Sequence, residues 1–251
     1  TVCLVALGEH VEALSFLSRL LGSEQRQAPH LLLYQRLLAR DEDGATSLIE
    51  SHVTEVEPND LYTATDMLAR DVISPVLSLI KRDAIMDALH EDEKNRILGL
   101  LNARIASLTE SHSHADLKKE APRIILCPAA DAVDETAANL LALVLKAGGA
   151  SCGVISHSLL ASEVNAVASG ERTRLINIVS AAVRLCKRLS SLQNKAEIAV
   201  NYWGDLSDAN KATLEKAGAR RVVKSLWDAH DLLAPLDQFY KSQETEISKA
   251  S

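Results

Sequence analysis

The sequence has few aromatic residues and no excess of basic charge. Only 3% of its 251 residues are aromatic while 47% are hydrophobic, so the interior must be built from aliphatic side chains rather than rings. The net charge is −7, whereas a nucleic-acid surface requires clustered Lys and Arg. These shortages exclude a nucleic-acid partner and disfavour anionic lipid. The length predicts two domains.

Cysteine is also scarce, and its four copies form no CxxC pair: Cys3, Cys127, Cys152 and Cys186. Three of them lie in apolar runs, where a free thiol behaves as a small hydrophobic group. We therefore expect reduced thiols and a cytoplasmic compartment, with no disulfide. His112, His114 and Asp116 lack a further ligand at metal-binding spacing, so we expect no metal site there.

No hydrophobic run is long enough to cross a membrane. Thr1–Leu7, TVCLVAL, is apolar throughout, but a transmembrane helix requires about 20 residues. It also lacks the basic region and cleavage site of a signal peptide. The residues alone leave two interpretations open: a buried first helix, or the tail of a membrane helix that begins upstream.

The first part of the chain has the apolar spacing of helices. From Glu9 to about Leu108, apolar residues recur on one face of each segment with charges opposite, which predicts a helical bundle over residues 1–110. Pro75 should kink or break the helix that it interrupts. We expect helices at 31–38, 44–53, 59–68, 72–80 and 94–108, with a polar turn at 91–95.

The pattern changes after residues 111–122, which lose the apolar period and are predicted to be a linker. From 123 to 240, short aliphatic runs alternate with helical segments, as in a five-stranded parallel, doubly wound (flavodoxin-like) sheet. Right-handed crossovers favour strand order 2-1-3-4-5. Residues 241–251 are expected to be a disordered tail. The predicted strands are 123–127, 151–155, 175–180, 197–203 and 220–223.

A ligand of such a sheet is expected outside the carboxyl ends of the strands. The first loop there, Ala129–Thr136, has no glycine and three carboxylates: Asp131, Asp134 and Glu135. Phosphate cradles use glycines, and carboxylates repel an anion, so we expect no dinucleotide. Because no His, Cys or Lys accompanies the carboxylates in the loop, we interpret Asp131 as a helix N-cap rather than a catalytic acid.

The α/β half resembles the cobalamin-binding fold, and the bundle before it resembles the helical cap of that fold. The family carries Asp-x-His-x-x-Gly after the first strand, where the His replaces the lower axial ligand of cobalt. The matching residues here are Asp131, Val133 and Thr136. Valine has no lone pair to offer cobalt, and the Trp and Glu-His pair usual in the cap are missing around residues 79–93.

Two later loops extend this comparison. The family's serine after the third strand matches Ser180, whereas the glycine pair after the fourth strand is replaced by Trp203-Gly204. These departures from the family pattern imply that no cobalamin and no other cofactor is bound. Catalytic and metal-binding residues are therefore expected to be absent.

A closer resemblance, to the cytosolic C-terminal region of the autoinducer-2 exporter-like family of membrane transporters, covers nearly the whole chain. It is carried by five stretches: TVCLVALGEHVEALSFLSRLLG (1–22), YQRLLARDEDGA (34–45), LCPAADAVDETAANLLALVLKAGG (126–149), RLCKRL (184–189) and AGARRVVKSL (217–226). In that family the first stretch directly follows the last membrane helix, so the resemblance favours a membrane-helix tail at Thr1.

The resemblance implies a non-enzymatic region that regulates or assembles a multi-pass transporter at the cytoplasmic face of the membrane. The implied partners are the membrane part of the same polypeptide and further copies of the chain, while the transported molecule would be a small signalling compound or an ion-coupled substrate. The alternative hypothesis is an autonomous sensor that binds a small ligand between bundle and sheet. Its predicted contacts are Asp131, Ser180, Tyr202 and Trp203.

Overall fold

The computed structural model describes residues 27–54, 61–112, 123–159, 161–170, 172–179, 182–191, 196–202 and 207–250. Several predictions concern residues outside these ranges: the membrane-helix tail at Thr1, the state of Cys3, most of the linker, and the site residues Ser180, Trp203 and Gly204. Cys127, Cys152 and Cys186 are free and buried, as expected.

The sheet has five parallel strands in the order β2-β1-β3-β4-β5, which confirms the predicted topology. Its strands are β1 (Ile124–Pro128), β2 (Cys152–Val154), β3 (Leu175–Val179), β4 (Glu197–Asn201) and β5 (Arg221–Val223). Every residue of β1 and β3 is buried, because helices cover both faces of these strands. Ile124 pairs with Cys152 of β2 on one side and with Leu175 of β3 on the other. The strand order therefore reverses at β1, which is the topological switch point of the sheet.

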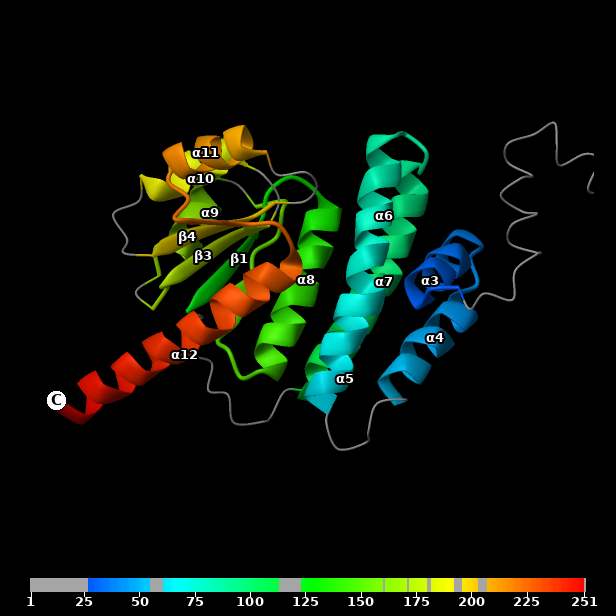
Figure 1. Ribbon diagram of the computed structural model, residues 1–251, viewed down its shortest axis with the longest axis horizontal. Helices are drawn as coiled ribbons and strands as arrows, with labels where there is room; N and C mark the ends of the chain where they lie inside the picture. The colour runs from blue at the N-terminus through cyan, green and yellow to red at the C-terminus, as the bar shows by residue number, and fades with distance from the viewer. Residues whose placement is uncertain are drawn as a thin grey trace, which may run out of the picture.

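Two layers of helices enclose the sheet (Figure 1). One face is covered by α8 (Ala132–Ala147) and α12 (Leu226–Ala250), and the other by α9 (Ala161–Ala168), α10 (Val183–Ser190) and α11 (Asp208–Lys216). After α8 the chain turns at Gly149, whose φ of +83° lies in the left-handed region that favours glycine. The helix therefore ends where glycine can adopt this conformation.

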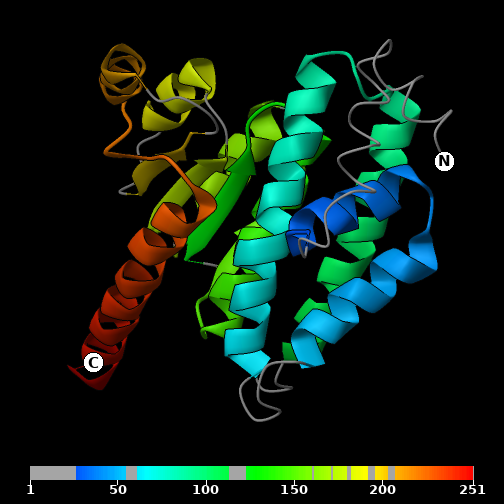
Figure 2. The same cartoon turned by 45° about the vertical axis from the view of Figure 1, so that its right-hand side comes forward.

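The helical bundle packs on the side of α8 that faces away from the sheet (Figures 1 and 2). It comprises α3 (Pro29–Leu38), α4 (Glu42–Thr54), α5 (Leu61–Leu68), η1 (Ala69–Ile73), α6 (Ser74–Ile85) and α7 (Glu91–His112). The turn η1 is π-helical, and Pro75 lies in the first turn of α6. Because proline lacks an N–H and its ring clashes with the preceding turn, a widened turn before Pro75 lets α5 continue into α6.

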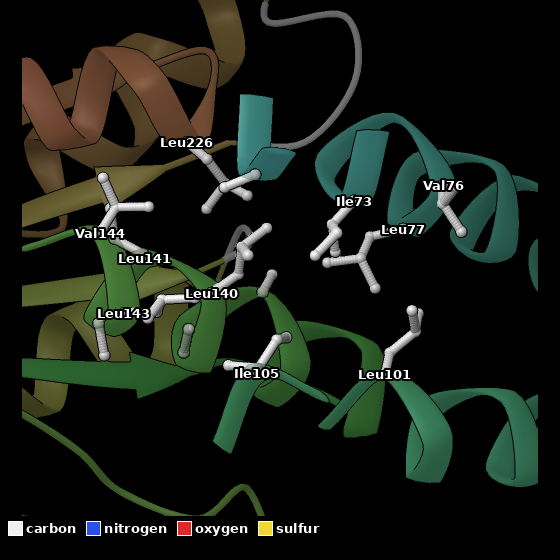
Figure 3. Packing of buried hydrophobic residues seen from close by; sticks show 14 of the residues in the cluster. Ile73, Val76, Leu77, Leu101, Ile105, Leu140, Leu141, Leu143, Val144 and Leu226 are labelled. Atoms are coloured by element: carbon white, nitrogen blue, oxygen red, sulfur yellow. The ribbon is translucent and has the colours of Figure 1, made fainter. Parts of the chain in front are cut away.

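Bundle and sheet share one hydrophobic core. The buried cluster contains Leu77 of α6, Leu101 of α7, Leu140 of α8 and Leu226 of α12, and Figure 3 shows side chains from these four helices meeting at α8. A second buried cluster fills the opposite face, between the sheet and α9, α10 and α11. The side chains are almost all aliphatic, as the shortage of aromatic residues predicted.

Two predicted segments differ from the structure. Glu91–Asn95, expected as a turn, forms the start of α7, because its acidic residues complement the positive end of the helix dipole. The backbone from 241 to Ala250, expected as a disordered tail, continues α12. In the part of the chain that is described, no helix combines the length and apolar character needed to span a bilayer.

Candidate functional site

The loop between β1 and α8 is the corner that matches the cobalt-ligand motif. Asp131 is the N-cap of α8, and its Oδ1 accepts hydrogen bonds from the backbone N–H groups of Val133 and Asp134, both at 3.0 Å. The predicted capping role of Asp131 is therefore confirmed. A cap of this kind contributes about 1 kcal/mol to helix stability.

Asp131 also has a long-range partner in the bundle. Lys81 of α6 donates to Asp131 Oδ2 at 2.9 Å and to Asp134 Oδ1 at 2.7 Å. The Asp134 side chain is fully buried, and that of Lys81 is 16% exposed. The second oxygen of Asp134 accepts from the backbone N–H of Ala130 at 3.1 Å. One lysine thus joins the bundle to two carboxylates of the α/β half.

Burial and charge act in opposite directions on these three groups. For Asp131, burial raises the pKa, but the hydrogen bonds from Lys81 and the helix backbone outweigh it and the pKa is lowered. For Asp134, burial dominates and raises the pKa despite the contact with Lys81. Burial lowers the pKa of Lys81, but hydrogen bonds to Asp134 and Asp131 outweigh it, so the lysine stays charged at neutral pH.

The other two motif positions are also turned toward the bundle. Val133 is 1% exposed and belongs to the core shared with the bundle. Thr136 is fully buried; its hydroxyl accepts from Asn102 of α7 at 2.9 Å and donates to the carbonyl of Ala132 at 2.9 Å. Asn102 in turn accepts from Asn139 of α8 at 3.0 Å. Side chains of the chain itself therefore occupy the space that these residues face.

The third carboxylate of the loop, Glu135, reaches toward β2. It accepts hydrogen bonds from the backbone N–H of His157 at 2.8 Å and from the Ser156 hydroxyl at 3.0 Å, and it contacts His157 Nδ1. Burial alone would raise the pKa of Glu135, but these donors lower it. All three loop carboxylates thus make hydrogen bonds within the protein.

A cavity of about 470 Å³ lies at the carboxyl ends of β1 and β2, on the α9–α10 side of the sheet. Its wall includes Pro128 at the end of β1, Ala129 directly after it, Ser156 and His157 after β2, and the first turns of α10. The sequence predicted a ligand at this edge of the sheet, but the two fully charged residues of the cavity, Arg184 and Arg188, were not among the predicted contacts. The available signal was a helix, VRLCKRLS, with three basic residues and no acid.

Of the four contacts predicted for the sensor hypothesis, the two that the structure describes, Asp131 and Tyr202, are not part of the wall of this cavity. Asp131 faces α6 instead, and the Tyr202 hydroxyl accepts from Asn210 at 3.3 Å. Ser180 and Trp203 are outside the described residues. Within the described part of the chain, no group of His, Cys, Asp and Glu is arranged to hold a metal ion.

The geometry does not fit a corrinoid held through the motif. An imidazole nitrogen is required where the cobalt ligand would be, and the aliphatic side chain of Val133 lies there, packed in the core. The neighbouring polar groups of Asp131 and Thr136 are directed to Lys81 and Asn102. No residue described at this corner offers a replacement nitrogen donor directed away from the protein core.

Comparison with known proteins supports the fold. No protein family and no curated protein sequence matches this chain. Among solved structures, it is similar to the monomethylamine corrinoid protein of Methanosarcina barkeri, with a TM-score of 0.54 and 16% identity over 81% of this chain and 96% of that chain. At this identity the similarity shows a shared fold only.

Two further solved structures match at lower TM-scores. One is a cobalamin-binding protein from Desulfitobacterium hafniense DCB-2, with a TM-score of 0.39 and 10% identity over 83% of this chain and 97% of that chain. The other is the methanol:cobalamin methyltransferase complex of Methanosarcina barkeri, with a TM-score of 0.38 and 12% identity over 85% of this chain and 81% of that chain.

Proposed function

We propose that this chain is a non-enzymatic regulatory or assembly region, built on a cobalamin-type scaffold that no longer holds the corrinoid, and that it serves a multi-pass membrane transporter of the autoinducer-2 exporter-like family. The observation that carries the first part is the closed corner between β1 and α8. There Val133 is in the core and Lys81 binds Asp131 and Asp134.

The closed corner favours a structural role because it fixes the bundle against the sheet. Lys81 supplies a charged contact, and Asn102 donates a hydrogen bond to Thr136 and accepts one from Asn139. Aliphatic side chains of the shared core complete the contact. A scaffold in which a cofactor mediates this contact requires an opening at the same place. Here direct side-chain contacts join the helical bundle to the sheet without a cofactor. A movement of one half would therefore also move the other, which is what a regulatory or assembly region requires.

The transporter part of the proposal rests on the five sequence stretches that resemble that family. Its cytosolic location and its membrane partner follow from the same resemblance. The reading frame upstream of Thr1 tests it directly, because several apolar spans of about 20 residues each are expected there. Their absence would contradict the transporter role and leave the scaffold proposal standing.

A functional test compares the full-length transporter with a version that ends before this region, and with a version carrying Lys81→Met. If the region regulates or assembles the membrane part, truncation changes transport rate or oligomeric state, and Lys81→Met changes it in the same direction to a smaller extent. Equal transport and assembly in all three proteins would refute a regulatory or assembly role.

A second candidate function is a small-ligand sensor, and one observation favours it. The cavity at the carboxyl ends of β1 and β2 has a volume of about 470 Å³, within the usual range for small-molecule sites. It lies where ligands of doubly wound sheets bind. Unlike the closed corner, it is lined by residues of the α/β half alone.

A further inference from the structure

The cavity after β1 and β2 combines an apolar wall with an excess of positive charge. Ile155, Leu159, Val164 and Leu185 supply apolar side chains, and Arg184 and Arg188 supply two guanidinium groups. No Asp or Glu is among the described residues of its wall. Glu135, which contacts this wall from the first turn of α8, accepts hydrogen bonds from Ser156 and His157.

The two arginines have no counter-charge in the described part of the chain. The Nε atom of Arg188 is buried without a hydrogen-bond partner, and no described carboxylate forms an ion pair with either guanidinium. Buried hydrogen-bond donors are almost always paired in folded proteins. The unpaired donor of a residue in the cavity wall therefore indicates that an acceptor binds there. Because Arg184 and Arg188 are four residues apart on α10, their charges also repel each other.

Other nearby groups do not neutralise this charge. Ala182, the N-cap of α10, makes no side-chain hydrogen bond to the helix, and the first turn contains no acidic residue. Burial raises the pKa of the Cys127 thiol to about 12, although the charge of Arg188 acts in the opposite direction. The thiol is therefore uncharged at neutral pH and cannot act as the counter-ion of Arg188.

We infer that this cavity binds a small organic anion, in which a phosphate or carboxylate group pairs with Arg188 and Arg184 and a compact apolar body lies against Ile155, Leu159 and Val164. The inference rests on the second candidate function and names its ligand class. Guanidinium groups suit this role because their planar donors match the oxygens of phosphate and carboxylate. The loop carboxylates do not oppose binding, since Asp131 and Asp134 are directed toward Lys81.

Calorimetric titration of the 251-residue chain with phenyl phosphate, in a low-salt chloride buffer, tests this site. Inorganic phosphate, benzoate and benzyl alcohol separate the contributions of the anion and the apolar body. Phenyl phosphate should bind most tightly, benzoate and inorganic phosphate more weakly, and benzyl alcohol without measurable heat. No binding of phenyl phosphate or benzoate, or equal binding of benzyl alcohol, would overturn the inference.

Three variants locate the site. Arg188→Gln should weaken phenyl phosphate binding about tenfold or more, since the charge-assisted hydrogen bond that the guanidinium donates to the anion is lost. Lys187→Gln is the matched control, because it removes the same charge from an exposed neighbouring position of α10 that is not part of the cavity, and its affinity should stay within about twofold of the unmodified chain. Equal weakening by both variants would show nonspecific charge attraction and overturn the assignment.

Arg184→Gln keeps the test independent of folding, because Arg184 is exposed and its replacement should leave the melting curve unchanged while weakening binding. Unchanged affinity in both arginine variants would also overturn the assignment.

Cobalamin retention is measured in a separate experiment. If phenyl phosphate does not bind, the sensor function and this inference are both refuted. The proposal that the corrinoid site is closed is not affected by that result.

Discussion

Replacing Lys81 with methionine tests whether the bundle and the sheet are joined by charge at the closed corner. Methionine keeps most of the length and apolar volume of lysine but leaves the fully buried carboxylate of Asp134 without its cation. Removing one partner of a buried ion pair costs about 3–5 kcal/mol. Since Asp134 keeps its hydrogen bond from Ala130, and Asp131 is 37% exposed, we expect the lower end of that range.

Urea unfolding followed by circular dichroism measures this loss. The double variant Lys81→Met with Asp134→Asn should recover at least half of it, because no buried charge is then left unpaired. Lys211→Met, at an exposed position of α11, is the control and should change stability by less than about 0.5 kcal/mol. A loss below that value for Lys81→Met would refute the role of this ion cluster.

The same variant has a defined pH dependence. The pKa of Lys81 is raised in the folded chain, so its stabilising contribution is fully present below the unfolded pKa of about 10.4 and is lost as the pH rises through the folded value. The stability difference between the unmodified chain and Lys81→Met should therefore be constant near neutral pH and shrink in alkaline solution. A difference that grows with alkaline pH would contradict this assignment.

Three further substitutions test neighbouring contacts. Val133→His restores the motif residue but should not confer cobalamin absorbance. It should lower the free energy of unfolding by about 1–3 kcal/mol, because it buries a polar ring. Bound cobalamin would mean that the chain had lost only the cobalt-binding histidine and not the rest of the site. Thr136→Val should cost about 1–3 kcal/mol in urea unfolding by removing the acceptor of Asn102, and no change would exclude a role for that bond. Arg123→Met should cost about 3–5 kcal/mol, because Asp237 is 1% exposed and binds Arg123 at 2.8 Å; a smaller loss than that of Lys211→Met would contradict the ion pair.

The fold could be predicted from the sequence because its signals are local. Continuous aliphatic runs such as Ile124–Cys127 mark strands buried on both faces, and the handedness of crossovers restricts their order. The capping role of Asp131 was also predictable, since a cap involves only the next few residues. The prediction of a turn at Glu91–Asn95 was wrong because acidic residues fit a helix start as well as a turn.

The contacts that define the site were not predictable in the same way. Lys81 lies 50 residues from Asp131 and Asn102 lies 34 residues from Thr136, so their pairing depends on how the bundle packs on α8. No periodicity in the sequence carries that information. The arginines of α10 did leave a local signal, four residues apart in a helix without acids, but the cavity beside them is formed by loops from separate strands.

The most direct test of the closed corner is cobalamin retention by the purified chain. The protein is incubated with hydroxocobalamin or methylcobalamin, passed through gel filtration and examined by visible absorbance, with a corrinoid protein that carries the motif histidine as the positive control. Because Val133 lies in the core and Lys81 joins the bundle to Asp131 and Asp134, we predict no corrinoid absorbance in the protein fraction. A corrinoid spectrum that elutes with the protein at about one cofactor per chain would contradict the account.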